Sequence, residues 1–379
     1  MVNKKVGLVT YYGDNYGGCL QAYAIQQTVK SLGFEPNILQ VNIPLKTTDH
    51  NRWISVLRVL RNPVSFLLRR KFIIANTKNN VIRSHAFDRF RSEFLTFDSS
   101  FTLSRESLSG AEGYSIFVCG SDQIWNPNLY GVHPIWTLKF APEGAKRIAY
   151  APSLGVSSIP EEYIAGFQEN LKDYTYISCR EQEGANSLSK ILNREVDVVL
   201  DPTLLLTPER WHEFARPVEV KKPYVFCYLF GDYDYIEKVK KRVKAYFNLD
   251  IVCLPYNLRE LKADDLKLYD ITPNQFVWLI ENATCVVTDS FHASVFSIKM
   301  STPFVSLKRT SDSDKKNMNS RLYTLLKTVG LENRLVGENM VDDVAGILSR
   351  EVDFKAANDR LSEFMKRDIA KLKGAFSHE

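Results

Sequence analysis

Several common features are missing from this chain of 379 residues, and each absence excludes a class of protein. No segment approaches the roughly 18 consecutive apolar residues that a membrane-spanning helix needs. The cysteines and histidines form neither Cys-x-x-Cys nor His-Glu-x-x-His, so the sequence predicts no zinc site and a chemistry without a metal or other cofactor. No Walker loop, Gly-x-Gly-x-x-Gly, RNA-binding or helix-turn-helix signature is present, and we expect no nucleic acid partner.

The start of the chain lacks the long apolar run of a signal peptide, because residues 1–6 lead straight into a short strand-like segment. Five of the six cysteines lie in apolar, strand-like runs, which is typical of buried reduced thiols: Cys119, Cys179, Cys227, Cys253 and Cys285. These observations predict a cytoplasmic enzyme. The net charge of +5 and the sequence pI near 8.7 suit anionic partners.

Short apolar segments alternate with helical patterns along the chain, which predicts parallel sheets with helices on both faces. The strands expected for the first sheet are 6–10, 36–41, 114–119, 147–150, 174–179 and 196–200. Those expected for the second are 224–229, 251–254, 284–288 and 304–306. Prolines between 201 and 223 mark a domain boundary. We therefore predict an α/β fold of two Rossmann-like domains facing across a cleft, at 1–205 and 206–352, followed by a last helix at 353–379.

The stretch from Thr284 to His292 carries the most information about function. An apolar, β-prone run ends there at Thr288, Asp289 and Ser290, which are residue types that cap helices, and a helical segment follows to Lys299. Such a turn aims free N–H groups and the positive end of the helix dipole at the sheet edge where α/β proteins bind ligands. His292 is therefore a candidate for anion contact and proton transfer, although packing or capping fits its spacing equally well.

A second strand-to-helix turn opens the chain. Residues 6–10 read as a buried strand and 17–32 as a helix, and a loop rich in Gly, Asn and Asp joins them at 11–17. This loop is able to approach a ligand closely, but a tight turn without a binding role fits the pattern better.

Six motifs, taken together, resemble the polysaccharide pyruvyl transferase family. They are Asn15-Tyr-Gly-Gly-Cys-Leu-Gln-Ala-Tyr-Ala24, Val118-Cys-Gly-Ser-Asp-Gln-Ile-Trp-Asn-Pro127, Tyr150-Ala-Pro-Ser-Leu-Gly155, Ser178-Cys-Arg-Glu181, Leu200-Asp-Pro-Thr203 and Thr288-Asp-Ser-Phe-His-Ala-Ser-Val-Phe-Ser297. The resemblance implies a fold similar to GT-B glycosyltransferases, with the last helix packing back on the N-terminal domain. It also implies transfer of pyruvate from phosphoenolpyruvate to a sugar of a surface glycan, as a cyclic ketal. Some family members carry Arg-Leu-His where this chain has Ser290-Phe291-His292, so another cation is expected to replace that arginine.

The resemblance and the strand-end positions together suggest roles for individual residues. His292 is the expected general acid or phosphate contact, and Asp122 the expected base for a sugar hydroxyl. Arg180 is expected to grip an anion in two places, and Trp125 to offer a face on which a sugar stacks. Further substrate contacts are expected at Asn15, Tyr16, Gly17 and Ser290, and the replacement cation at Lys308, Arg309 or Arg321. For each, an ordinary cap, core or surface role remains open, and Asp201 is interpreted as part of a structural turn.

An insertion is predicted at about 44–110, and part of it has an unusual charge pattern. From His50 to Phe87 there is no acidic residue, whereas eight basic residues lie among bulky apolar ones: Arg52, Arg58, Arg61, Arg69, Arg70, Lys71, Lys78 and Arg83. This composition suits a peripheral helix at an anionic inner membrane surface, where it would bring the enzyme to a lipid-linked oligosaccharide acceptor. Packing of its apolar side on the domain explains the pattern slightly better.

Two other functions remain open at this point. A GT-B glycosyltransferase that uses a nucleotide sugar would keep the fold and change the donor. A membrane-associated scaffold without catalytic activity would use only the basic segment.

Overall fold

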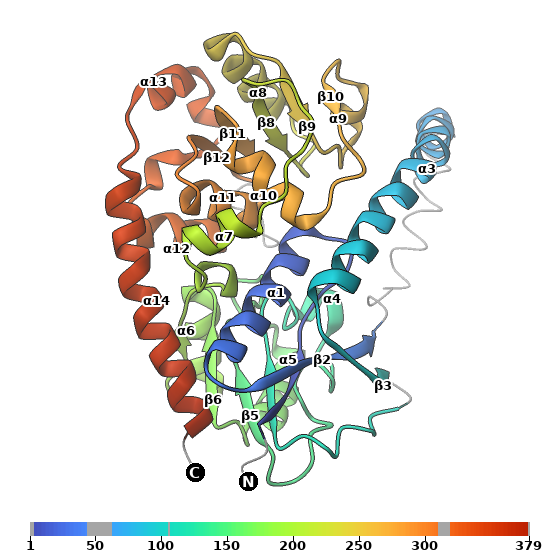
Figure 1. Ribbon diagram of the computed structural model, residues 1–379, viewed down its shortest axis with the longest axis vertical. Coiled ribbons are helices and arrows are strands. Elements are labelled where there is room, and N and C mark those ends of the chain that lie inside the picture. The colour runs from blue at the N-terminus through green and yellow to red at the C-terminus, as the bar shows by residue number, and fades with distance from the viewer. Residues whose placement is uncertain (1–3, 44–62, 105–106, 310–318, 378–379) are drawn as a thin grey trace.

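The computed structural model describes residues 4–43, 63–104, 107–309 and 319–377, and it contains two parallel sheets (Figure 1). The first has the order β3-β2-β1-β4-β5-β6-β7 and the second the order β10-β9-β8-β11-β12-β13. The strands of the first are β1 (Lys5–Val9), β2 (Glu35–Asn42), β3 (Phe97–Ser104), β4 (Ile116–Cys119), β5 (Lys146–Ala149), β6 (Tyr176–Cys179) and β7 (Asp197–Val198). Those of the second are β8 (Val225–Tyr228), β9 (Ile251–Cys253), β10 (Leu266–Lys267), β11 (Cys285–Thr288), β12 (Phe304–Leu307) and β13 (Leu335–Val336).

Helices connect the strands and cover the sheets. In the N-terminal domain they are α1 (Tyr16–Ser31), α3 (Pro63–Phe94), α4 (Pro127–Tyr130), α5 (Glu161–Leu171) and α6 (Gln182–Leu192). The 3₁₀ turn η1 (Pro202–Leu204) and α7 (Pro208–Phe214) lead into the C-terminal domain. There the helices are α8 (Asp234–Phe247), α9 (Leu258–Lys262), α10 (Pro273–Glu281), α11 (Phe291–Lys299), α12 (Ser320–Val329), η2 (Glu332–Arg334), η3 (Glu338–Asp343), α13 (Val344–Ser349) and α14 (Phe354–Ser377).

One large apolar cluster spans both domains, and each domain also has a buried cluster of its own. Residues of β1, α1 and η1 pack in the same buried cluster as residues of β8, α10 and α11. Tyr16 illustrates this contact, because its fully buried ring stacks on Phe276 of the C-terminal domain with ring centroids 4.7 Å apart. Trp211 of the connecting α7 likewise packs edge-on against Phe296 at 4.9 Å. Apolar burial of this kind holds the two sheets in a defined relation.

Two long helices run along opposite sides of the molecule and connect the domains (Figure 1). Helix α14 follows the C-terminal domain and ends on the N-terminal one, where Phe376 stacks on Phe34 at 4.5 Å. Buried Asp368 of α14 also accepts a hydrogen bond from the Leu200 backbone N–H at 2.7 Å. On the other side, α3 packs against α1 and α10, and the Arg83 guanidinium donates to the Pro255 carbonyl at 2.7 Å.

The range expected as an insertion contributes ordinary elements to the N-terminal domain. Its described part forms α3 and the edge strand β3, which pairs in parallel with β2. Arg83, expected among the membrane-facing cations, is instead buried against Tyr256, 4.1 Å from the ring centroid. The cations Arg52, Arg58 and Arg61 lie outside the described residues, as do the side chains of Arg69, Arg70 and Lys71.

Candidate functional site

Side chains from the ends of several strands and from two helices meet where the domains face each other. Arg180 follows β6, Asp122 follows β4 and Asp201 follows β7, all at the carboxyl edge of the first sheet. His292 lies in the first turn of α11, directly after β11 of the second sheet. Because parallel strands present their carboxyl ends at one edge, residues far apart in sequence converge here.

Asp201 lies at the centre of this cluster and is fully buried. Its Oδ2 accepts hydrogen bonds from Arg180 Nη1 at 2.7 Å and Ser121 Oγ at 2.8 Å, and it lies 3.6 Å from His292 Nε2. Its Oδ1 accepts from the Thr203 hydroxyl at 2.7 Å. Burial alone would raise the pKa of Asp201, but His292, Arg180 and Thr203 together hold it well below its usual range. Asp201 is therefore a carboxylate at neutral pH.

The ring of His292 is held between its own helix and the start of α1. Its side chain is 8% exposed, and Nε2 has no hydrogen-bond partner among the described residues. Gly17 is directly against the ring, because a Cβ atom built there would lie only 1.9 Å from His292 Nδ1. A side chain at position 17 is thus incompatible with the observed position of the imidazole.

Two buried arginines come from opposite domains, Arg180 from the end of β6 and Arg321 from α12, and both approach the Phe291 ring. Their guanidinium carbons lie 4.6 Å and 5.9 Å from its centroid. Nε of both arginines and Nη2 of Arg180 lack a hydrogen-bond partner among the described residues. Burial, followed by the charge of Arg180, lowers the pKa of Arg321 to about 10, so it remains a cation at neutral pH. N–H groups of this kind are able to donate hydrogen bonds to an anion, although Arg180 is already ion-paired with Asp201 at 2.7 Å.

Asp122 faces this pair from the loop after β4. Its Oδ1 lies 3.6 Å from Arg180 Nη2, and its side chain keeps 18% of its surface exposed. The negative charge of Asp122 affects the pKa of two nearby tyrosines. Burial, then Asp122, raises the pKa of Tyr11 to about 12, and burial, then Tyr11 and Asp122, raises the pKa of Tyr130 above its usual range. Both phenols therefore stay protonated and able to donate hydrogen bonds.

The residues before His292 shape the start of α11. The Thr288 hydroxyl donates to the Tyr228 carbonyl at 2.6 Å, and Ser290 Oγ accepts from the Ala293 N–H at 3.4 Å as the helix N-cap. Asp289 accepts from the Gly231 N–H at 2.7 Å and forms an ion pair with Arg309 at 3.3 Å. These bonds fix the turn that presents His292.

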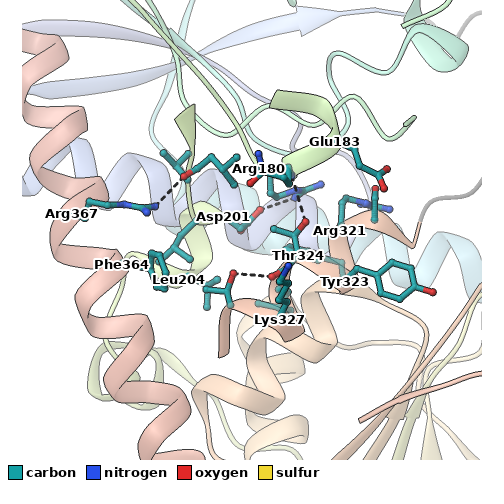
Figure 2. Close-up of a pocket in the computed structure, with 18 residues that line it drawn as sticks. Arg180, Glu183, Asp201, Leu204, Arg321, Tyr323, Thr324, Lys327, Phe364 and Arg367 are labelled. Atoms are coloured by element: carbon teal, nitrogen blue, oxygen red, sulfur yellow. Dashed lines mark hydrogen bonds and ion pairs between the residues drawn. The ribbon is translucent and has the colours of Figure 1, made fainter. Parts of the chain in front are cut away.

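A pocket of about 590 Å³ opens beside the cluster, between α6 of the N-terminal domain, α12 and α14 (Figure 2). Arg180, Asp201, Phe291 and Arg321 form one part of its wall. This volume lies within the range of small-molecule sites, roughly 300–1,000 Å³.

The structure assigns other surroundings to several residues expected at the site. Asn15 caps α1 by accepting from the Gly18 N–H at 2.9 Å. Lys308 has its ammonium 5.2 Å from the Tyr323 ring centroid. The expectation for Trp125 is wrong, because its ring is only 1% exposed and its Nε1 donates to the Trp136 carbonyl at 2.8 Å. Tyr16 is likewise in the core and has no exposed surface for a substrate.

Sequence reasoning missed the central position of Asp201. It does begin the turn η1, as interpreted, but the same carboxylate contacts both Arg180 and His292. The available signal was its position at a strand end within the Leu200–Thr203 motif. Tyr11 was also missed, since it lies in a loop whose composition indicates only a turn.

Two further observations bear on cofactors and membranes. Among the described residues, no group of three or more His, Cys, Asp or Glu side chains is placed to hold a metal ion. Within the same part of the chain, no helix is long and apolar enough to span a bilayer.

Comparisons with known proteins add the family and the fold. The model of the family described as polysaccharide pyruvyl transferase matches residues 15–311. No curated protein matches the chain. Among solved structures, a Listeria monocytogenes protein described as a UDP-N-acetylglucosamine 2-epimerase is similar over 100% of this chain and 97% of its own, with 9% identity and a TM-score of 0.54. The UDP-N-acetylglucosamine 2-epimerase of Rickettsia bellii is similar over 98% of this chain and 97% of its own, with 9% identity and a TM-score of 0.51. At such identities the likeness shows the fold alone, which is GT-B.

Proposed function

Because this chain belongs to the polysaccharide pyruvyl transferase family, we propose that it transfers pyruvate from phosphoenolpyruvate to a sugar of a surface-polysaccharide precursor as a cyclic ketal. The observation that carries the proposal is the pair of buried arginines, Arg180 and Arg321, which keep N–H groups free beside His292 and Asp201.

Phosphoenolpyruvate carries two anionic groups, a phosphate and a carboxylate, and therefore needs more than one cation. Arg180 and Arg321 supply two cations from opposite domains, and their mutual repulsion falls when an anion lies between them. Arg321 then takes the place of the arginine that some family members carry at position 290. Arg309 is less suited to this role, because its guanidinium pairs with Asp289.

Ketal formation needs an acid and a base. One sugar hydroxyl adds to C2 of the enol while C3 receives a proton, and a second hydroxyl then displaces phosphate from C2, which leaves both oxygens bound to the same carbon. We assign the transfer of the C3 proton to His292, whose Nε2 lies 3.6 Å from the Asp201 carboxylate. Asp122, partly exposed at the same sheet edge, accepts the hydroxyl proton.

The experiment is an incubation of the protein with phosphoenolpyruvate and a panel of sugar acceptors, with products identified by mass and released phosphate measured in parallel. Arg180→Lys and Arg321→Lys keep the charge but lose two-point contact, so we expect a higher KM for phosphoenolpyruvate in each. The exposed Arg360→Lys, on α14, is the control. Sugar transfer from a nucleotide sugar, without phosphate release from phosphoenolpyruvate, would refute the proposal in favour of a glycosyltransferase.

A further inference from the structure

Each of the two sheets reverses its strand order once. In the first sheet the reversal lies between β1 and β4, because β2 and β3 are on the other side of β1. In the second sheet it lies between β8 and β11, with β9 and β10 on the other side of β8. Open α/β sheets bind their ligands outside the carboxyl ends of the strands at such a reversal. The fold therefore offers one candidate position in each domain.

At the second sheet, the loops at the reversal are bonded to each other. Asp289, which follows β11, accepts hydrogen bonds from the backbone N–H groups of Phe230 and Gly231, which follow β8, at 2.9 Å and 2.7 Å. The Asp289 side chain is fully buried and also pairs with Arg309 at 3.3 Å. These polar groups already satisfy one another, so they offer little to a ligand.

At the first sheet, the corresponding loops carry polar groups that are partly exposed. Tyr11 follows β1 and Asp122 follows β4, and the ends of these strands pair in register, Val9 with Cys119. Asp122 keeps 18% of its side chain exposed, and Tyr11 is half-buried. Tyr130, at the end of α4, is half-buried as well. The first sheet thus presents two phenols and a carboxylate where a ligand is expected.

Glycines at the start of α1 make room for the Tyr11 ring. A Cβ atom built at Gly18 would lie 2.7 Å from the ring, and one built at Gly13 would lie 2.4 Å from the phenolic oxygen. The backbone is fixed too, since Gln21 Nε2 donates to the Tyr11 carbonyl at 2.6 Å. Gly17, next to Gly18, meets the His292 ring in the same way. Two consecutive glycines of α1 therefore accommodate the phenol and the imidazole.

The two phenols have hydrogen-bonding capacity to spare. In the part of the chain that the structure describes, neither the Tyr11 nor the Tyr130 hydroxyl has a hydrogen-bond partner. A phenol both donates and accepts, whereas the Asp122 carboxylate only accepts. Hydroxyl-rich rings need such a mixture of donors and acceptors, and they also pack on the faces of aromatic side chains. This set of groups suits a sugar.

The charges around Tyr11 are mostly negative. Burial, and then negative charges that include Asp122 and Asp14, raise the pKa of Tyr11 to about 12. Arg91 has the opposite effect on this pKa, but it is already paired with Asp14 at 2.9 Å and with Asp88 at 2.6 Å. A ligand with a carboxylate would meet like charges here, unlike at the arginine pair.

We propose that the acceptor sugar is an uncharged ring that binds between the loops after β1 and β4, where the Tyr11 and Tyr130 hydroxyl groups hold its oxygens. The ring then lies next to Asp122, the base of the proposed mechanism. The inference rests on the proposed function for the presence of a sugar acceptor. It makes Tyr11 and Tyr130 residues that determine acceptor specificity, and it excludes uronic acids from this position.

The first test measures sugar binding without any donor, by saturation-transfer NMR on the full chain. The probes are the methyl glycosides of glucose, galactose and mannose and those of the corresponding uronic acids. We expect a neutral sugar to bind at least about threefold more tightly than its uronic acid, and Asp122→Asn to reduce this difference. Tyr11→Phe should weaken binding of the neutral sugar about two- to tenfold, the range for one neutral hydrogen bond.

Tyr246→Phe is the matched control, because this phenol is 44% exposed on α8 of the other domain and should not affect binding. Thermal unfolding shows whether a variant still folds, and Tyr11→Phe should melt with the parent since its hydroxyl has no partner in the described fold. Binding of none of the sugars, tighter binding of the uronic acids, or unchanged binding in Tyr11→Phe would overturn the inference.

Kinetics separate this inference from the proposed function. With an acceptor that receives pyruvate, Tyr11→Phe should raise the KM for the acceptor and leave the KM for phosphoenolpyruvate unchanged. If transfer occurs and Tyr11→Phe keeps the parent's KM for the acceptor, the inference fails and the proposed function stands. If neutral sugars bind as expected but none receives pyruvate, the proposed function fails and the sugar site stands.

Discussion

Replacement of Gly17 by alanine tests whether His292 is held where the structure places it. The added Cβ would lie 1.9 Å from Nδ1 of the imidazole, whereas ordinary contact begins at 3.4 Å. The ring must therefore move by roughly 1.5 Å, or α1 and α11 must separate by that amount. A displacement of about 1 Å of a reacting group can cost about 10²-fold in rate, so we expect a loss of at least that size in kcat.

The same substitution should leave folding largely intact. Gly17 is the second residue of α1, and alanine is a better helix former than glycine. This gain opposes the strain at the ring, so the unfolding temperature should change little while the rate falls. Phosphate release from phosphoenolpyruvate plus acceptor measures the rate, and thermal unfolding followed by circular dichroism measures stability.

Gly166→Ala is the matched control. Gly166 also lies in a helix, α5, and the atoms nearest to an added Cβ there are those of Val132, at 3.2 Å. It should retain both activity and stability. If the kcat of Gly17→Ala lies within about threefold of that of the parent enzyme, the imidazole is not confined by α1. The assignment of His292 then loses its structural support.

Four other predictions follow from the site and the sequence. His292→Ala should lower the rate roughly 10²–10⁴-fold in a folded protein, and near-normal turnover would exclude it as the acid. Asp201→Asn should destabilise the fold by about 3–5 kcal/mol at neutral pH, because it leaves buried Arg180 without its carboxylate. Folding depresses the pKa of Asp201, so the stability that its ionised carboxylate contributes is present above the unfolded pKa near 3.9 and is lost as the pH falls below about 4. The difference in unfolding free energy between the parent and Asp201→Asn should therefore narrow below about pH 4. A difference that stays constant with pH in denaturant titrations would contradict this. Activity should survive dialysis against EDTA, and recovery only on adding a divalent ion would show that a metal is needed. The basic segment from His50 to Phe87 should bind anionic but not neutral vesicles. Salt should reverse this binding, and the double substitution Arg58→Glu with Arg69→Glu should weaken it. Equal sedimentation with both lipids would assign the segment to domain packing.

The sequence predicted the fold well where strands are buried and apolar. All strands at the centre of both sheets were expected within a few residues of their observed bounds. The missed strands, β3, β10 and β13, lie at sheet edges. Phe97–Ser104 is rich in serine and partly exposed, and β10 and β13 have two residues each, so none shows the apolar run that marks a buried strand.

The site was harder to predict because strand-end positions show which residues converge but not which way they face. Arg180, Asp122 and His292 all end or follow strands, and the structure brings them into one cluster with Asp201. Trp125 is equally close to a strand end, yet it turns into the core against Phe167 and Tyr174. Burial of a single side chain depends on tertiary packing, which a local motif does not encode.

Because one apolar cluster spans both sheets, we expect the two domains to unfold together as one cooperative unit. Tyr16, Ile25 and Phe87 of the N-terminal domain are buried together with Phe276 and Phe296 of the other. A fragment cut at the connecting segment would expose this face to water and would be prone to aggregate. The intact chain should therefore melt in a single transition, and opening of the cleft should involve displacement of loops and side chains more than a hinge between rigid halves.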